Sequence, residues 1–453
     1  MIHNRLGWFT AVSLHMKYLW LFVILFVCQA AEFPLYRKLP IPPDKDPFYC
    51  PPAGFEHSKP GTILRIRKIK NPPGFRYLDH ELQSAHQILY RTTDSHGNPL
   101  TTVTTVLIPH RADLDRLLSY QIAEDSNFIQ CAPSYTLQFK TPPAQSVGAR
   151  VEFLIIQAAL NQGFVVSVPD YEGPRSAFPA ALLESHAVLD SVRAVVASGL
   201  TQSDAKVVLW GYSGGSIATG WAAQMRKSYA PELPIEGVAI GGIPANFTAL
   251  MYTDNGGFFT GFLVAALFGL SEEYPDVMEF MKSQFSHSTM QYFARVKHQC
   301  LIPEVLTFPF IDFTRLAKSG EQVFEDPILK SVFANNSMGQ SCPDMPILIY
   351  HSQCDEIIPI GPVDSLYEEW CKEGATVTFR RDILSEHVSE LIEGAPEALL
   401  WIKQRFEGKK VERGCSRRTG LTNLIDPEGV EVMGRKVATE MVEMLLNLPP
   451  QAV

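Results

Sequence analysis

The chain has 453 residues, a length typical of two or three domains, and 46% of them are hydrophobic and 19% charged. This is the composition of a globular protein, which excludes a mostly disordered, collagen-like or coiled-coil chain. The net charge of −9 argues against a nucleic-acid partner, because phosphate binding needs a wide basic surface.

The N-terminal segment, residues 1–31, is typical of a secretory signal peptide. Lys17 precedes an apolar run at residues 19–27, and small residues at 30–31 supply the cleavage site. The run is too short to anchor the chain across a bilayer. We therefore expect a secreted protein. Translation from Met16 would give a more ordinary signal peptide than translation from the first residue.

Cysteines and glycosylation sequons agree with an oxidising compartment. Of the eight cysteines, Cys28 leaves with the signal peptide, and because the remaining number is odd, at least one thiol stays free or pairs between chains. No CxxC spacing is present, so we expect no metal site. Asn246 and Asn335 each begin an N-glycosylation sequon.

Strand-like patterns come first along the mature chain. Alternating or β-branched residues predict strands at residues 62–67, 87–92 and 102–108, and a short apolar run follows at 117–123. Helical and strand patterns then alternate, over residues 150–162 (helix), 164–168 (strand), 180–198 (helix), 206–210 (strand) and 216–229 (helix). This order predicts an α/β fold with a mostly parallel sheet and helices on both faces.

The alternation of strands and helices stops at residues 246–336, a segment rich in Phe, Met and Leu. It resumes with strands at residues 346–350 and 375–379. A helical insertion in such a core predicts a cap or lid over the active site, with additional core as the alternative. The tail at residues 426–446 predicts a helix that packs on the core or, alternatively, binds a partner or a membrane surface. We therefore divide the mature chain into core (32–245), helical cap (246–336), core (337–410), and a C-terminal flap and helix (411–453).

The sharpest motif is GYSGG at residues 211–215, directly after the strand at 206–210 and before a helix. In this setting G-x-S-x-G predicts a tight turn that projects Ser213 from the end of the strand. Glycines flank the serine because side chains there would collide within the turn. We predict that Ser213 is a nucleophile rather than part of a glycine-rich turn.

A nucleophilic serine needs a histidine base, which a carboxylate holds in place. On a turn of this kind the three residues follow the chain order Ser, Asp or Glu, His. Asp355 follows the strand at 346–350, with Glu356 as the competing acid. His387 is the one histidine beyond Asp355, whereas His351 precedes the acid and predicts a structural role.

Two N–H donors are needed to stabilise the oxyanion that forms during acyl transfer. The amide of Gly214, one residue after the nucleophile, predicts the first donor. The second should come from the loop after an early strand, where residues 123–126 (AEDS) place Asp125. The alternative role for Asp125 is a helix N-cap.

Several of these motifs together resemble the secreted fungal lipase family typified by Candida lipase A. They are the GYSGG turn, residues 123–126 with 131–135 (CAPSY), residues 168–174 (VPDYEGP) and the loop of His387, and the likeness runs from about residue 46 to 415. The resemblance implies an α/β-hydrolase fold with a helical cap and lid, and hydrolysis of carboxylic esters without a cofactor. The family also includes trichothecene-deacetylating esterases.

The resemblance carries roles over by motif, giving Ser213 as nucleophile, Asp355 as acid, His387 as base, and Asp125 and Gly214 as oxyanion donors. It also implies two disulfides, Cys131–Cys300 and Cys371–Cys415. Three cysteines are left over (Cys50, Cys342 and Cys354), and a bridge between the last two stays open.

Three functions follow from these patterns. A lipase or broad esterase is favoured, because the apolar cap suits long acyl chains. The alternatives are an esterase that deacetylates a fungal secondary metabolite and an inactive module that binds a hydrophobic ligand. We expect an ester substrate as partner and no stable membrane span, while contact with a lipid interface stays open.

Overall fold

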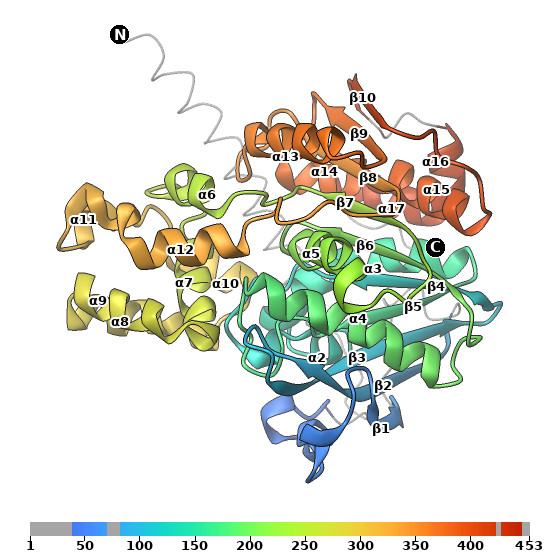
Figure 1. The fold of residues 1–453 in the computed structure, drawn as a ribbon, viewed down its shortest axis with the longest axis horizontal. Helices are drawn as coiled ribbons and strands as arrows, with labels where there is room; N and C mark the ends of the chain where they lie inside the picture. The colour runs from blue at the N-terminus through green and yellow to red at the C-terminus, as the bar shows by residue number, and fades with distance from the viewer. Residues whose placement is uncertain (1–38, 70–81, 423–426, 446–453) are drawn as a thin grey trace.

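The computed structural model describes residues 39–69, 82–422 and 427–445 (Figure 1). The predicted signal peptide, residues 1–31, and the candidate start at Met16 lie outside these residues. Within the described part of the chain, no helix combines the length and apolar character needed to span a membrane.

The core of the molecule is a ten-stranded sheet in the order β1-β2-β3-β5-β4-β6-β7-β8-β9-β10. The first three strands and the β3–β5 pair are antiparallel, and every pair from β5 to β10 is parallel. The mostly parallel sheet predicted from the sequence is therefore confirmed. Its strands are β1 (Ile63–Lys68), β2 (Leu82–Thr93), β3 (Pro99–Pro109), β4 (Asp113–Gln121), β5 (Phe164–Pro169), β6 (Lys206–Tyr212), β7 (Ile235–Gly241), β8 (Ile347–Ser352), β9 (Val377–Asp382) and β10 (Cys415–Gly420).

Helices cover both faces of the sheet, which explains why its central strands are apolar on both sides. Val207 and Leu209 of β6 belong to the hydrophobic cluster of one face, and Val208 and Trp210 to that of the other. The first face carries α4 (Ala181–Ala197), α5 (Gly214–Tyr229) and α13 (Ile360–Lys372). The second carries α3 (Pro143–Asn161), α15 (Ala395–Phe406), α16 (Pro427–Met433) and α17 (Arg435–Leu445).

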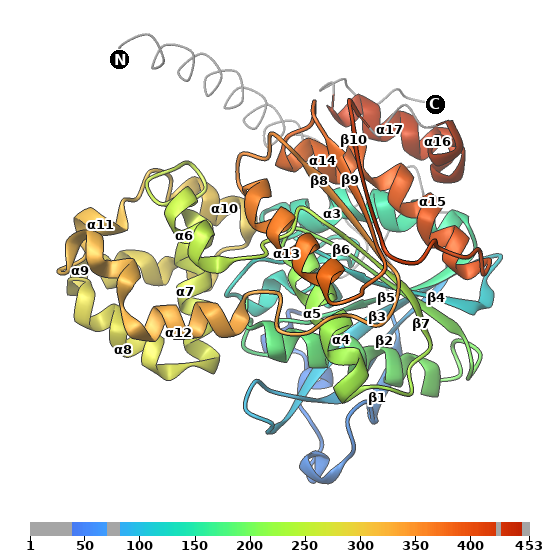
Figure 2. The same cartoon turned by 45° about the horizontal axis from the view of Figure 1, so that its top comes forward.

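A block of helices connects β7 to β8. Its α-helices are α6 (Phe247–Asp254), α7 (Gly261–Glu273), α8 (Pro275–Gln284), α9 (His287–Phe293), α10 (Leu301–Thr307), α11 (Phe313–Leu316) and α12 (Pro327–Asn336). In both views α8, α9, α11 and α12 lie to one side of the sheet (Figures 1 and 2). Their buried phenylalanines, such as Phe293 and Phe313, join the cluster formed by α4 and α5.

Several strands exceed what the sequence pattern predicts: β2 begins five residues before the predicted strand, and β7 is not predicted at all. β4 begins at Asp113, four residues before the apolar run, because its first half is polar and partly exposed. β10 has the sequence CSRRTG and is exposed along most of its length, so its side chains give no strand signal; it forms by parallel pairing with β9. The predicted terminal helix is present as α16 and α17, which bury Val432 and Met441 against the second face.

Both disulfides implied by the resemblance are present, Cys131–Cys300 and Cys371–Cys415. The further bridge that the sequence left open, Cys342–Cys354, is not formed, and both thiols are free. The two residues lie before and after β8, and a six-residue strand spans about 20 Å, which is too far for a disulfide.

Candidate active site

The GYSGG motif forms the turn between β6 and α5. Ser213 has a φ of 52° and a ψ of −126°, a backbone conformation that residues other than glycine rarely adopt. A Cβ atom on Gly211 would lie 2.3 Å from the Gly215 carbonyl oxygen, and one on Gly215 would lie 2.0 Å from the carbonyl oxygen of Gln121. The flanking positions therefore have no room for a side chain, which is the physical reason for the motif.

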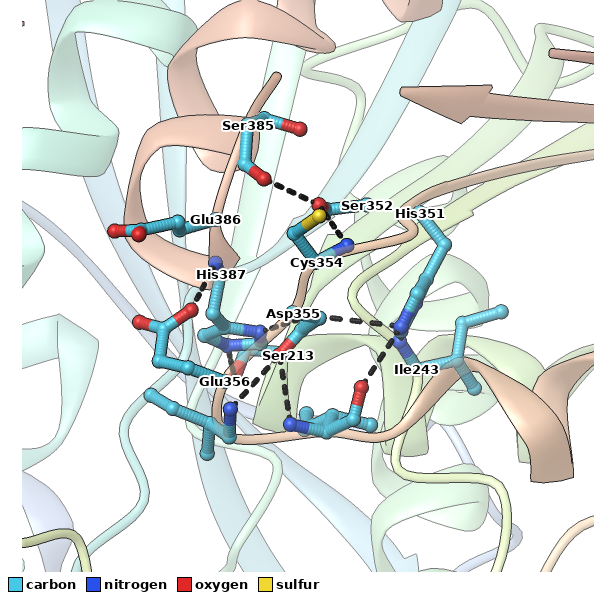
Figure 3. A network of polar contacts seen from close by, with 12 residues as sticks. Ser213, Ile243, His351, Ser352, Cys354, Asp355, Glu356, Ser385, Glu386 and His387 are labelled. Carbon is cyan, nitrogen blue, oxygen red and sulfur yellow. Dashed lines mark hydrogen bonds and ion pairs between the residues drawn. The ribbon is translucent and has the colours of Figure 1, made fainter. Parts of the chain in front are cut away.

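Three predicted site residues meet at the carboxyl ends of the parallel strands. His387 Nε2 lies 2.8 Å from Ser213 Oγ, and His387 Nδ1 lies 2.7 Å from Asp355 Oδ2 (Figure 3). Both are ordinary hydrogen-bond distances. Ser213 follows β6, Asp355 lies in the loop after β8, and His387 begins α14 (His387–Glu393) after β9. The sheet thus brings together residues separated by up to 174 positions.

Asp355 is the better-supported acid because all of its interactions favour the ionised carboxylate. Its Oδ1 accepts hydrogen bonds from the backbone amides of Ile357 at 3.1 Å and Ile358 at 2.7 Å. Burial alone would raise the pKa of Asp355, but His387 and these amides outweigh burial and lower it. Burial would likewise lower the pKa of His387, yet the charge and hydrogen bond of Asp355 raise it.

The competing acid, Glu356, contacts the histidine through the backbone instead. Its carboxylate accepts a hydrogen bond of 2.7 Å from the backbone amide of His387 (Figure 3). Tyr212 contacts the backbone of His387 as well, since its hydroxyl donates to the His387 carbonyl oxygen at 2.7 Å. Both contacts fix the backbone from which the imidazole projects.

His351 supports the acid loop and does not reach Ser213. Its Nδ1 accepts from the backbone amide of Ile243 at 3.2 Å, and its Nε2 donates to the carbonyl oxygen of Ile358 at 3.0 Å. This pairing requires the neutral imidazole, and burial lowers the pKa of His351 accordingly. The same Nε2 is 3.5 Å from Asp355 Oδ2.

Asp125 and Gly214 lie side by side in the wall of the pocket that Ser213 lines. A Cβ atom on Gly214 would be 1.5 Å from Asp125 Oδ1, so only glycine fits beside this carboxyl. Asp125 has a φ of 47° and does not cap a helix, because the next helical turn, η4 (Ile129–Cys131), begins after Phe128. As the first residue of α5, Gly214 has a backbone amide that α5 itself leaves free.

Further buried carboxyl groups surround Asp125. Burial raises the pKa of Asp125 to about 7. It also raises the pKa values of Glu124, Glu172 and Glu184 well above their ordinary range, and neighbouring carboxylates add to the shift. Within the described residues, neither carboxyl oxygen of Glu184 has a hydrogen-bond partner. Sequence reasoning missed Glu184, although a glutamate on the apolar face of a helix was a signal that could have found it.

Ser213 lines a pocket that opens to solvent. Most of its wall is apolar, and the ionisable side chains among its lining residues are Asp125 and Asp254. Over the described residues, no group of three or more His, Cys, Asp or Glu side chains is arranged to hold a metal ion.

Comparison with known proteins agrees with this geometry. Residues 137–414 match the model of a family described as Secretory lipase. The chain is 42% identical over 424 residues to Lipase A of Arthroderma benhamiae, covering 92% of this chain and 90% of the relative. The chain belongs to the secretory lipase family. As a member of this family it is a carboxylic ester hydrolase.

Two further comparisons extend over most of this secretory lipase. It is 35% identical over 446 residues to a protein of Malassezia restricta named secreted triacylglycerol lipase LIP3, covering 96% of this chain and 95% of that relative. The X-ray structure of Candida antarctica lipase A in its closed state matches with a TM-score of 0.83 and 31% identity, covering 89% of this chain and 96% of that one. These relatives do not favour the metabolite deacetylase or the inactive binding module.

Proposed function

We propose that this hydrolase is a secreted lipase that cleaves esters of apolar acyl chains with Ser213, His387 and Asp355. The observation that carries the proposal is the hydrogen-bonded chain of these three side chains, whose serine lines an apolar pocket. A binding protein would have no use for all three groups in this order.

In the proposed mechanism Ser213 Oγ attacks the ester carbonyl carbon while His387 Nε2 takes the hydroxyl proton. Asp355 stabilises the imidazolium that results. The amides of Gly214 and Asp125 donate to the oxyanion. His387 then protonates the leaving alcohol, and water attacks the acyl-enzyme with the same histidine as base, which regenerates Ser213.

The pocket supports an apolar acyl group as substrate. Its walls include phenylalanine, leucine and isoleucine side chains from the core and from α6 and α7. The name of the Malassezia restricta relative points to triacylglycerols as one ester class. We also propose contact with a lipid interface through exposed aromatic residues of the cap, namely Tyr252, Tyr292 and Phe310.

Secretion of this chain rests on its N-terminal pattern and on three features that fit it. The family is described as secretory. The chain carries two disulfides, which persist in oxidising compartments. Asn246 and Asn335 are exposed, as glycosylation requires.

Initial rates on p-nitrophenyl esters from acetate to palmitate test the proposal. We expect a maximum at medium or long chains, and with Ser213→Ala as blank a loss on the order of 10⁶ in kcat. Activity confined to acetate would contradict the lipase and support a deacetylase. Unchanged activity in Ser213→Ala would contradict the mechanism.

A further inference from the structure

One face of helix α6 lines the same pocket as Ser213. Its pocket-lining residues are Phe247, Leu250, Met251 and Asp254. They stand at positions i, i+3, i+4 and i+7, a spacing that places side chains on one face of a helix. The side chain of Asp254 therefore faces the pocket, where it adds a carboxyl group to the end of an apolar row.

The carboxyl group of Asp254 is unsatisfied among the described residues. It forms no hydrogen bond and no ion pair with them, and the residue is only 5% exposed. The backbone at this position is fixed, because the Asp254 carbonyl oxygen accepts hydrogen bonds from the amide of Gly257 at 2.9 Å and from the hydroxyl of Thr260 at 2.8 Å. The pocket thus contains a buried hydrogen-bonding group that a bound molecule can satisfy.

This position is unfavourable for an aspartate. Burying a carboxyl group without a hydrogen bond costs free energy, and a negative charge at the C-terminal end of a helix is disfavoured as well. A second leucine like Leu250, which lies on the same face of α6, would avoid both costs. An aspartate that lowers stability inside a pocket beside the nucleophile is typical of residues that enzymes retain for function.

Asp254 belongs to the wall along which the proposed function places the acyl chain. Phe262, Leu263 and Ala266 of α7 line the same pocket. The hydrogen bond from Thr260 to the Asp254 carbonyl oxygen joins the start of α7 to the end of α6. An acyl chain that contacts both helices therefore passes the carboxyl group of Asp254.

A hydroxyl group on the acyl chain is the partner that fits this position. An ionised carboxyl group accepts a hydrogen bond from a hydroxyl, and a protonated one both donates to it and accepts from it. The match therefore does not depend on the protonation state of Asp254. An ammonium group fits less well, because the apolar walls leave its remaining N–H donors without partners.

We infer that Asp254 is a specificity-determining residue that binds a hydroxyl group on the acyl chain, so that the enzyme prefers esters of hydroxylated fatty acids. This inference rests on the proposed function, since it takes the acyl chain to lie along α6 and α7. A site that is built to hydrogen-bond a hydroxyl disfavours the analogue that lacks it, because the buried carboxyl group then stays unpaired.

Matched esters test the inference through kcat/KM. Ethyl dodecanoate is compared with four ethyl esters that carry a hydroxyl at carbon 3, 6, 9 or 12 of the same acyl chain. Two further esters move the hydroxyl or change the charge: 2-hydroxyethyl dodecanoate has its hydroxyl on the alcohol, and ethyl 12-aminododecanoate carries a cation. The variants are Asp254→Leu, the nearly isosteric Asp254→Asn, and Asp276→Asn, which removes a carboxylate at an exposed position of the same cap.

For at least one hydroxyl position, we expect the ratio of the hydroxylated ester to ethyl dodecanoate to be about tenfold higher in the wild type than in Asp254→Leu, the effect of one hydrogen bond. Comparing this ratio between proteins cancels the intrinsic reactivity of each ester. Asp254→Asn should keep part of the preference, and Asp276→Asn all of it. Equal ratios in the wild type and Asp254→Leu at every position, or an effect of Asp254 confined to the alcohol or amine ester, would overturn the inference.

The proposed function is tested separately in the same experiment. Cleavage of ethyl dodecanoate by the wild type, and its loss in Ser213→Ala, depend on the catalytic residues and not on Asp254. Failure of the inference leaves this activity intact, whereas failure of the proposed function removes it. Asp254→Leu should still cleave ethyl dodecanoate, which shows that the variant is folded.

Discussion

Buried carboxyl groups near Ser213 have pKa values shifted in opposite directions in two regions, one around His387 (the histidine side) and one around Asp125 and Gly214 (the oxyanion side). On the histidine side, Asp355 receives two backbone amides and the imidazole of His387, and its pKa is lowered. On the oxyanion side, Glu184 and Asp125 are buried with carboxyl oxygens that no described residue satisfies, and their pKa values are raised.

The difference shows that burial alone does not set the charge of a carboxyl group at this site. The number of donors that face it decides whether the ionised form survives. The arrangement suits the proposed chemistry on both sides. A negative charge is kept where an imidazolium forms, and negative charge is reduced where an oxyanion forms.

The largest expected effect comes from removing the charge on the histidine side. Asp355→Asn should lower kcat by about 10⁴, because the amide no longer stabilises the imidazolium or fixes its tautomer. Glu356→Gln is the matched control and should stay within about tenfold of the wild type, since its amide oxygen still accepts from the His387 backbone. Equal losses in the two variants would show that the acids are misassigned.

The oxyanion side is tested by Gly214→Ala. The added Cβ would lie 1.5 Å from Asp125 Oδ1, so one of the two residues must move. We expect kcat to fall by about 10² to 10³, the effect of losing one oxyanion donor. Gly148→Ala is the control, because a Cβ there meets no atom within 4 Å. Wild-type kcat in Gly214→Ala would contradict the proposed position of the oxyanion.

The pH dependence of kcat/KM reports the pKa of His387. His387 must be neutral to accept the proton, and its pKa lies above its ordinary value of 6.5. The rate should therefore rise with pH through an inflection above 6.5. Because the charge of Glu356 contributes to the raised pKa, Glu356→Gln should move the inflection to lower pH. An inflection that does not move would remove Glu356 from this account.

The stability of the protein at two pH values tests whether the pKa of the buried carboxyl group of Glu184 is raised. The folded pKa of Glu184 is raised above its ordinary 4.5, so its contribution is complete below pH 4.5 and is lost as pH rises toward the folded pKa. In urea the wild type should be more stable at pH 5 than at pH 8, and Glu184→Gln should reduce this difference. The exposed Glu279→Gln should leave it unchanged. A wild type that is more stable at pH 8 would contradict the comparison.

The sequence predicts the residues to which we assign the chemistry, because their positions are set locally or by chain order. Ser213 is recognisable from its glycines, and His387 is the last histidine of the chain. Choosing Asp355 over Glu356 needed the resemblance, since both follow the same strand. The structure separates the two by the atoms of His387 that they contact.

Features that depend on packing between distant segments could not be predicted. β10 has no apolar alternation and exists through its pairing with β9. Glu184 and Asp254 read as ordinary polar residues of helices until the fold places one beside Asp125 and the other in the pocket. The sequence left a Cys342–Cys354 bridge open for the same reason, because spacing along the chain does not show that β8 separates the two thiols, which are free.

The most direct test of the central claim is peptide mass spectrometry after labelling with a fluorophosphonate. We expect one adduct, on Ser213, that forms rapidly in the wild type and far more slowly in His387→Ala, because the serine loses its base. An adduct on another residue, or equal labelling rates in the two proteins, would contradict the account.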